Sequence, residues 1–344
     1  MCKNFRYLDE LIHSEEEIIL DSDISLSGTE EAEYFEGIEL DKDDLIIDGN
    51  GHTIDACGKT RIFNCTGENI TIRNIALKNG FSDENGGAIT VDEDCELIIT
   101  ESTFEANTSA EDGGAIFNEE GTLTIKKSTF LQNTAGDFGG AVNNWGNMDV
   151  IESTFKENKA NFGGALHNSE QLNVFKSTIE ANVANKGAAI YNEDGELNIS
   201  EVSFNANSAN SDGGALVNTN SDMTIVKSIF KSNKSQDDGG AIYTMGELTV
   251  TECGFDENTS NRDGGAICAY RADLLIKESE FKNNASKRNG GAIQNFDGEM
   301  TIRDSTLSAN TADFGGAIYS EKSVLESDNT VLNDNKPDDI CEKN

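Results

Sequence analysis

The sequence predicts an all-β protein, a single-stranded parallel β-helix of about 12 coils. Three observations support this fold class. A Gly-Gly-Ala-aliphatic signal returns at intervals of 24 to 27 residues. Each interval holds three short apolar clusters with the period-two alternation of strands. The hydrophobic content is only 36%, which suits a core one coil wide. The signal begins at Gly86, Gly113, Gly139, Gly163, Gly213, Gly239, Gly264, Gly290 and Gly315, and a tenth copy at Gly187 has lost its second glycine.

The spacing of the apolar clusters predicts where each coil turns. The first cluster follows the glycines, as at Ile116, and the second is an alternating segment such as 123–125. The third is Phe, or an aliphatic residue in its place, as at Phe130. The step from second to third cluster is always seven residues, whereas the other two connections vary in length. Length variation belongs to surface loops, so we expect one tight corner and two solvent-facing corners per coil.

Polar residues recur at fixed places and are expected to stack in columns. Asn follows each Phe-type position by three residues, as at Asn133, and a small residue such as Ser128 precedes it by two. Amide side chains can bond one another from coil to coil. We therefore interpret the Asn column as a structural ladder and the Ser column as packing, in preference to ligand or nucleophile sites.

An acidic column precedes the glycines, and it could hold a divalent cation. Ordinary turn chemistry is the preferred interpretation, because Asp and Asn satisfy turn backbones with their own side chains. The sequence therefore predicts no metal and no cofactor. The members of this column are Asn85, Asp112, Asp212, Asp238, Asp263 and Asn289.

The chain is expected to form a single, monomeric domain in two parts. Residues 1–40 are interpreted as an N-terminal cap, with a helix over Phe5 to Glu16 and two short strands after it. Apolar residues at helical spacing predict that this helix covers the open end of the β-helix. Residues 41–340 are interpreted as the β-helix itself. Seven scattered cysteines without a C-x-x-C pair, at 2, 57, 65, 95, 253, 268 and 341, are expected to be free thiols.

The charge excludes two classes of partner. With 63 acidic and 26 basic residues, the net charge is −37. Nucleic acids and anionic membrane surfaces are polyanions, so binding to either is not expected. No run of 18 apolar residues is present, and no secretory signal is recognised at the N-terminus, so a cytoplasmic location stays open.

The repeat resembles the polymorphic outer-membrane-protein repeat, in which G-G-A-I is followed by F-x-x-N, as in 113–116 and 130–133. It is also similar to adhesin-like proteins of methane-producing archaea, whose β-helix domains begin like residues 46–54. The resemblance covers roughly residues 40–340. It implies a right-handed, pectate-lyase-like solenoid and an adhesive role at the cell surface or outside the cell.

Function is expected to be non-enzymatic, because acidic residues are spread over nearly every coil and no coil is specialised. The main hypothesis is an adhesin-like protein that binds glycans or surface proteins of another cell. Two alternatives remain, a polysaccharide lyase or glycoside hydrolase on the same fold, and a passive spacer. No catalytic residue is assigned. The candidate binding face is a row one residue after the first aliphatic, where aromatic rings can stack on sugars: Phe117, His167, Tyr191, Tyr243 and Tyr319.

Overall fold

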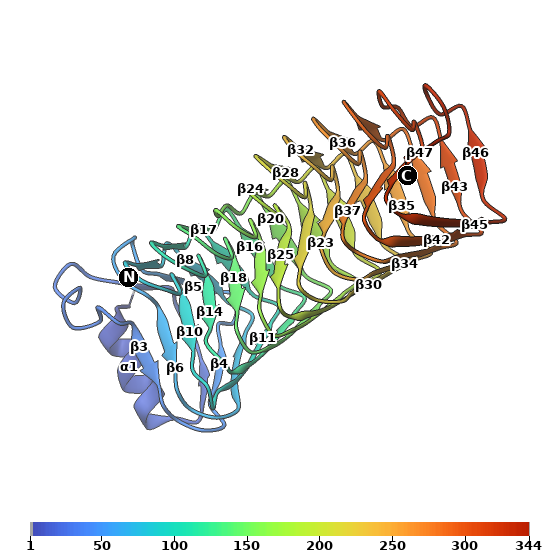
Figure 1. Cartoon of the computed structure of the whole chain (residues 1–344). Helices are drawn as coiled ribbons and strands as arrows, with labels where there is room; N and C mark the ends of the chain where they lie inside the picture. Colours follow the sequence, from blue (N-terminus) through green and yellow to red (C-terminus); the bar gives the residue numbers. More distant parts are fainter. Residues whose placement is uncertain (1–2, 344) are drawn as a thin grey trace. The chain divides into compact units, whose positions relative to one another are not determined.

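The computed structural model describes residues 3–343, which wind into about 13 coils of parallel strands (Figure 1). Equivalent strands of successive coils pair in register, so that Phe104 lies beside Phe130 and Phe130 beside Phe155. The prediction of an all-β parallel β-helix is therefore confirmed. Cys2 lies outside the described residues, and the six other cysteines are free thiols, as expected.

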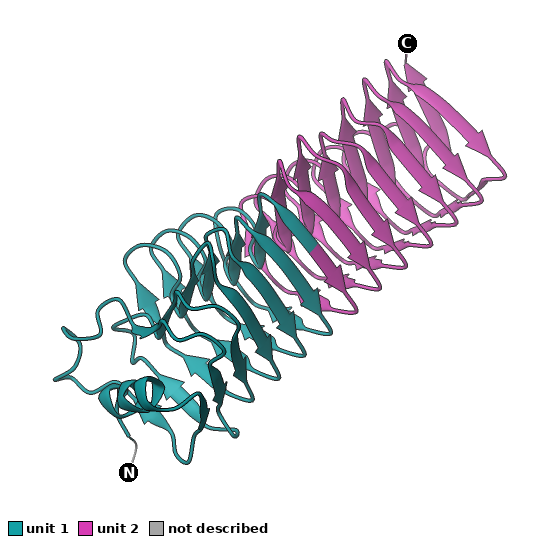
Figure 2. Cartoon of the chain, turned by 90° about the horizontal axis from the view of Figure 1, so that it is seen from below, with its two compact units in different colours: residues 1–172 teal, residues 173–344 magenta. Residues whose placement is uncertain are grey.

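The coils group into two compact units, 1–172 and 173–344, which are coloured separately in Figure 2. We call them unit 1 and unit 2 and describe each by itself. Their boundary falls within strand β22 (Gln171–Phe175). The expectation of one monomeric domain stays a prediction.

Unit 1 begins with helix α1 (Phe5–Ser14), and its strands form three sheets and one short ladder. The first sheet holds β1 (Glu17–Ile19), β4 (Ile46–Asp48), β7 (Ile70–Arg73), β11 (Glu96–Thr100), β15 (Thr122–Lys126) and β19 (Asn147–Ile151). The second holds β3 (Ile38–Leu40), β6 (Phe63–Cys65), β10 (Ile89–Val91), β14 (Ile116–Asn118), β18 (Val142–Asn144) and β21 (Leu166–Asn168). The third holds β2 (Ile24–Ser25), β5 (Thr53–Asp55), β8 (Ala76–Lys78), β12 (Thr103–Glu105), β16 (Thr129–Leu131) and β20 (Thr154–Lys156). The short ladder holds β9 (Phe81–Ser82), β13 (Thr108–Ser109) and β17 (Thr134–Ala135).

Unit 2 repeats the same arrangement. Its first sheet holds β26 (Glu196–Ser200), β30 (Met223–Val226), β34 (Leu248–Thr251), β38 (Leu274–Lys277), β42 (Glu299–Arg303) and β45 (Val324–Asp328). Its second holds β25 (Ile190–Glu193), β29 (Leu216–Thr219), β33 (Ile242–Thr244), β37 (Ile267–Tyr270), β41 (Ile293–Phe296), β44 (Ile318–Glu321) and β47 (Ile340–Lys343). Its third holds β23 (Thr178–Glu180), β27 (Ser203–Asn205), β31 (Ile229–Lys231), β35 (Gly254–Asp256), β39 (Glu280–Lys282), β43 (Thr306–Ser308) and β46 (Val331–Asn333). The short ladder holds β24 (Val183–Ala184), β28 (Ser208–Ala209), β32 (Lys234–Ser235), β36 (Thr259–Ser260) and β40 (Ala285–Ser286). The sequence predicted three strands per coil, so the strands of these short ladders, two residues each, were not predicted.

The interior of each unit is built from side chains that repeat at the same place in every coil. Phe130 stacks between Phe104 and Phe155 with ring centroids 4.6 and 4.8 Å apart. In the Asn column, Asn107 Nδ2 donates to Asn133 Oδ1 at 2.9 Å, and the next coil repeats the contact. Buried amides are costly unless paired, so this ladder fixes the register of the coils. The predicted columns are confirmed.

The turn before the Asn column contains one residue in the left-handed conformation in each coil. Asn tolerates the left-handed conformation, but it is not the residue that adopts it here. Instead, the residue before each Asn takes it, for example Ala106 and Gln132, both with φ 56°. The Asn side chain is thereby free to cap the turn, and Asn133 Nδ2 also donates to the Phe104 carbonyl.

The two glycines of the repeat are required for different physical reasons. The first takes positive φ, and a Cβ on Gly264 (φ +63°) would lie 2.2 Å from the Ile267 carbonyl oxygen. The second lies against the next coil, and a Cβ on Gly265 would lie 2.0 Å from the Gly291 carbonyl oxygen. Both distances are far below van der Waals contact, so a side chain at either of these two positions would force the backbone to shift, as it must where Ala188 replaces the second glycine.

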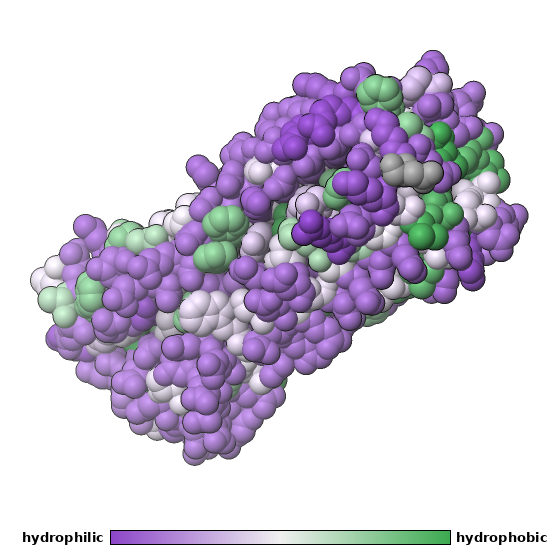
Figure 3. All heavy atoms as spheres, viewed as in Figure 1, coloured by the Kyte–Doolittle hydropathy of each residue, from purple (hydrophilic) through white to green (hydrophobic). Residues whose placement is uncertain are grey.

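The N-terminal helix covers the first coil of unit 1, as predicted. It begins after Asn4, whose side chain accepts from the Tyr7 amide at 3.2 Å. Its buried face consists of Phe5, Leu8 and Ile12, and it contacts β2 and β3. Among residues 3–343, no helix is long and apolar enough to span a bilayer. The surface in Figure 3 is mostly hydrophilic, consistent with the large net charge.

Candidate active-site groove

On the outer face of the second sheet, equivalent positions in successive coils carry chemically different side chains. The first glycine lets the preceding corner fold back over this face, because its backbone lies directly against the strand that follows. The outward residue of that strand becomes a floor, and the residues before the glycine become a wall. Three positions define the face: floor residues one place after the first aliphatic, wall residues just before the glycines, and rim residues three places after the aliphatic.

In unit 2 these three positions enclose a groove of about 330 Å³. Floor and rim residues of adjacent strands lie side by side, as Cys268 and Gln294 do in β37 and β41. The groove is lined on its floor by Tyr243, Cys268, Gln294 and Tyr319, on its wall by Asp238, Arg262, Asp263, Arg288 and Asn289, and on its rim by Tyr270, Phe296 and Glu321.

Two aromatic rings form the rim. Tyr270 and Phe296 are neighbours in β37 and β41, and their rings stack at 5.2 Å with an interplanar angle of 4°. The Arg271 guanidinium lies over the Tyr270 ring and the Lys322 ammonium over the Phe296 ring, at 5.2 and 5.0 Å from the centroids. A flat pair of rings beside polar groups suits the apolar face of a sugar ring.

Two carboxylates from successive coils form the wall. Asp238 Oδ1 accepts from the Asp263 amide at 3.0 Å, and Asp263 Oδ1 accepts from the Asn289 amide at 3.2 Å. These bonds join equivalent positions of successive coils, so the acidic column has a structural role from coil to coil in place of the local turn bonds that were expected. Asp263 Oδ2 also accepts from the Arg288 guanidinium at 2.7 Å, whereas Arg262 Nε lies 3.7 Å from Asp238 Oδ1. Asp263 is thus directly paired with an arginine, and Asp238 only loosely.

Burial shifts the pKa values of three residues in the groove. Burial raises the pKa of Asp238 to about 6, although the Arg262 charge opposes this rise. Burial also raises the pKa of Tyr243 and of the Cys268 thiol, so both stay protonated at neutral pH. The thiol instead donates to Gln294 Oε1 at 2.9 Å. A buried, protonated thiol is not a nucleophile, so the reactive candidates in the groove are its carboxyl groups.

The five residues of the predicted binding face differ in how far they are exposed. All five lie on the floor of the outer face, but Phe117, His167 and Tyr319 are only 4, 3 and 2% exposed. The expectation of an open row of rings is therefore corrected at these three. The Phe117 ring contacts Trp145, the His167 ring contacts Phe138, and the Lys343 ammonium lies over the Tyr319 ring. Tyr191 and Tyr243 are half-buried. Tyr243 and Tyr319 line the groove, while Phe117 and His167 belong to unit 1. Their binding role stays a prediction.

The rim rings and the two arginines of the groove were not predicted from the sequence. A signal for the rim was present, because Tyr270 and Phe296 follow the first aliphatic of their coils by three residues and therefore also alternate outward. Nothing in the sequence placed Arg262 and Arg288 over the floor, because that depends on how the corner folds back.

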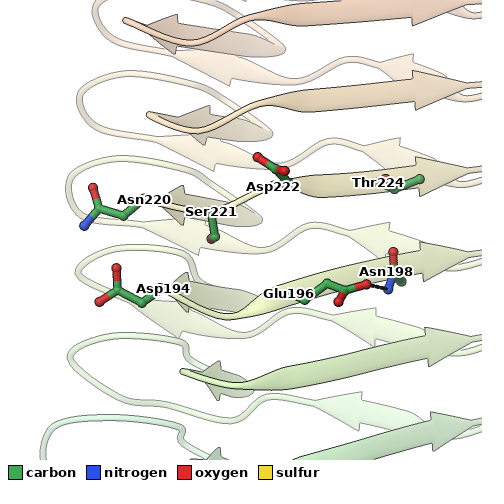
Figure 4. A pocket seen from close by; sticks show the side chains of 7 residues that line it. All are labelled: Asp194, Glu196, Asn198, Asn220, Ser221, Asp222 and Thr224. Atoms are coloured by element: carbon green, nitrogen blue, oxygen red, sulfur yellow. Dashed lines mark hydrogen bonds between the residues drawn. The ribbon is translucent and has the colours of Figure 1, made fainter.

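A second hollow of about 450 Å³ lies elsewhere in unit 2, at the corner between the second and first sheets (Figure 4). Figure 4 shows Asp194, Glu196 and Asn198 on one coil and Asn220, Ser221, Asp222 and Thr224 on the next. Asn198 Nδ2 donates to Glu196 Oε1 at 2.8 Å. These seven lining residues include no ring and no basic group, so the hollow offers less for recognition than the groove.

Comparison with known families supports the fold and the repeat. A profile described as a right-handed β-helix region matches residues 36–204. A profile of the Chlamydia polymorphic membrane protein repeat matches residues 227–245, 255–270 and 278–295. The predicted handedness and the resemblance to this repeat are thereby confirmed. Among curated proteins, none matches the sequence significantly.

Two solved structures with this fold are alginate lyases. The alginate lyase AlyF-OU02, solved as a complex, has 8% sequence identity and a TM-score of 0.51, over 99% of this chain and 86% of that one. A PL6 alginate lyase with a bound trisaccharide has 9% identity and a TM-score of 0.52, over 98% of this chain and 85% of that one. At such identity the likeness establishes the fold.

These neighbours correct the main functional expectation. A non-enzymatic, adhesin-like protein was expected, yet the solved structures that the chain resembles are polysaccharide lyases. The adhesin-like interpretation is therefore not kept as the main one. The argument that no coil is specialised also fails, because rings, arginines and closely placed carboxyl groups meet in the groove of unit 2.

Proposed function

We propose that the chain is a polysaccharide-active enzyme whose active site is the groove of unit 2. The observation that carries this proposal is the placement of Asp238 and Asp263 beside the stacked rings of Tyr270 and Phe296. A pair of carboxyl groups in different environments supplies an acid and a base to one site. The location proposed for this activity is the cell surface or the extracellular space, where polysaccharides are found.

The reaction that the wall supports best is glycoside hydrolysis. Asp238 and Asp263 occupy equivalent places in successive coils, and adjacent strands lie ~4.8 Å apart. Retaining glycosidases hold their two carboxyl groups ~5–5.5 Å apart. Asp238, with a pKa of about 6, is the acid that protonates the glycosidic oxygen as the C–O bond breaks. The Asp263 carboxylate, oriented by Arg288, attacks the anomeric carbon. Water then releases the sugar and gives its proton to Asp238.

Elimination from a uronate polymer is the second candidate, favoured by the two groove arginines and by the activity of the neighbours. Arg288 is already paired with Asp263, and Arg262 lies 3.8 and 3.7 Å from carboxylate oxygens of Asp237 and Asp238. Little positive charge is therefore left to neutralise a uronate. The net charge of −37 also repels polyanions. We therefore propose a neutral polysaccharide as the substrate.

The test is to incubate the protein with neutral polymers (xylan, mannan, β-glucan) and with alginate and pectate. New reducing ends without ultraviolet absorbance indicate hydrolysis, whereas absorbance of an unsaturated sugar indicates elimination. We expect reducing ends from a neutral polymer, and Asp238→Asn should lower kcat at least ~100-fold, as loss of general acid catalysis does.

Asp212→Asn is the matched control. Asp212 holds the same place one coil earlier and accepts from the Asp238 amide at 3.4 Å, but it does not line the groove. Its variant should keep the activity. Absence of products from all five polymers, or full activity in Asp238→Asn, would contradict the proposal.

A further inference from the structure

The chain has a single tryptophan, and unit 1 holds it on the rim of its own outer face. Trp145 follows strand β18, and its backbone amide donates to the Asn118 carbonyl at 2.9 Å. The indole is 41% exposed, and it contacts the buried Phe117 ring edge-to-face at 5.0 Å and 72°. The ring is therefore both accessible and held in place, unlike a tryptophan on a loose loop.

The wall opposite this rim is aromatic as well. Phe138 and Phe162 stand just before the first glycines of their coils, the places that Asp238 and Asp263 take in unit 2. Their rings stack at 5.0 Å, and Phe138 lies 4.6 Å from the His167 ring. Both phenylalanines are half-buried. Unit 1 thus uses aromatic rings on the two sides of the outer face.

The floor between these rings is polar. Phe117, Asn143 and His167 are neighbours on β14, β18 and β21. Asn143 Oδ1 lies 2.6 Å from His167 Nδ1. Asn143 is fully buried, and its Nδ2 has no hydrogen-bond partner of good geometry among residues 3–343. That amide is near enough to Asp112 to favour its charged form, although burial raises the pKa of Asp112 overall. A buried donor that lacks a bond of good geometry is costly, and it marks a place where a ligand hydroxyl would be favourable.

We propose that this face of unit 1 binds a neutral oligosaccharide, with a pyranose ring stacked on Trp145 and a sugar hydroxyl on Asn143. Rings with polar groups between them match the two surfaces of a pyranose, which has an apolar face and a polar edge. The wall offers Phe138 and Phe162 where the groove of unit 2 offers two carboxyl groups. Among the wall places at 112, 138 and 162, Asp112 alone has a carboxyl group, so this face lacks the pair that the proposed hydrolysis needs. It therefore binds without cleaving, and it is separate from the proposed active site.

The lone tryptophan makes the site directly measurable. We would titrate Asp238→Asn, which keeps the oligosaccharide intact, with cellohexaose, xylohexaose and mannohexaose, and record tryptophan emission. At least one sugar should shift the emission saturably and protect the indole from acrylamide quenching. The same sugar should bind by calorimetry in an Asp238→Asn, Tyr270→Ala, Phe296→Ala background, in which the groove of unit 2 has lost its rings.

Two variants of Trp145 in that background separate stacking from folding. Trp145→Ala should weaken binding ~10-fold or more, whereas Trp145→Phe, which keeps a ring, should stay within ~3-fold of the parent. Far-ultraviolet circular dichroism would verify that both variants fold. Unchanged emission with all three sugars, or equal affinity in Trp145→Ala, would overturn the inference. Neither readout depends on cleavage, so failure of the proposed enzyme activity would be seen separately.

Discussion

Units 1 and 2 have the same interior and different outer faces. Inside, both stack phenylalanines at about the same spacing, 4.8 Å between Phe130 and Phe155 and 4.7 Å between Phe230 and Phe255. Outside, the wall of unit 1 presents Phe138 and Phe162, and the wall of unit 2 presents carboxyl groups and arginines. Every coil must match its neighbours on the inside. The outer positions are free of that requirement, so chemistry can differ there without a change of fold.

The largest effect is expected from substitutions in the interior, which should destabilise the two units equally. Phe130→Ala in unit 1 and Phe230→Ala in unit 2 each remove a ring enclosed between two parallel rings. Each should lower the free energy of unfolding by ~3–5 kcal/mol, as large-to-small core substitutions do. Denaturant titration with hydrogen exchange, which reads each unit separately, would measure both losses. A large cost in one unit beside a small cost in the other would contradict a shared interior.

Phe117→Ala should be measured by the same denaturant titration as these two variants. Phe117 lies on the outward side of its strand, but its ring is buried against Trp145. We therefore expect an intermediate cost of ~1.5–3 kcal/mol, the burial free energy of one such side chain.

The next effect concerns the glycine that folds the corner back over the outer face in both units. Gly139 and Gly264 have φ of +65° and +63°, and an added Cβ would lie 2.3 and 2.2 Å from a carbonyl oxygen. Replacement of either by Ala should cost at least ~1–2 kcal/mol, the penalty for an L-residue in the left-handed region. Gly254→Ala is the control, because no atom lies within 4 Å of the added Cβ. Its melting temperature should be unchanged or higher, and a loss there equal to that of Gly264→Ala would argue against the corner as the cause.

The smallest effect is a pair of opposite pH dependences. Burial lowers the pKa of His167 from 6.5 to about 3. The unfolded chain therefore binds the extra proton, and this residue's contribution to unit 1 decreases as pH falls from 6.5 toward 3. Burial raises the pKa of Asp238 from 3.8 to about 6. The folded chain holds that proton more tightly, so the contribution to unit 2 decreases as pH rises from 3.8 toward 6.

Comparison of the wild type with His167→Gln and Asp238→Asn would measure these contributions by thermal unfolding between pH ~3.5 and ~7. The two difference curves should slope in opposite directions. Slopes of the same sign would contradict a lowered pKa of His167 in unit 1 together with a raised pKa of Asp238 in unit 2.

The fold was predictable from sequence because each coil needs the same residue types at the same interior positions. Ile116, Phe130 and Asn133 recur at near-constant spacing, and constant spacing is what stacking in register requires. The groove was harder to predict. Its members come from different coils and share no motif, and the folded-back corner that brings Asp238 over Tyr243 depends on backbone angles. The aromatic row was found on the right strands, but the burial of Phe117, His167 and Tyr319 was not foreseen.

The amide ladder also affects how such a protein can change in length. Asn233 Nδ2 donates to Asn258 Oδ1, and Asn258 Nδ2 donates in the same sense to Asn284 Oδ1. Duplication or deletion of one whole turn would give each remaining asparagine the same partner as before, whereas a partial insertion would break the series. Genetic change in steps of one complete turn is therefore the least disruptive route, and each duplicated turn brings a spare outer surface on which a new specificity can evolve.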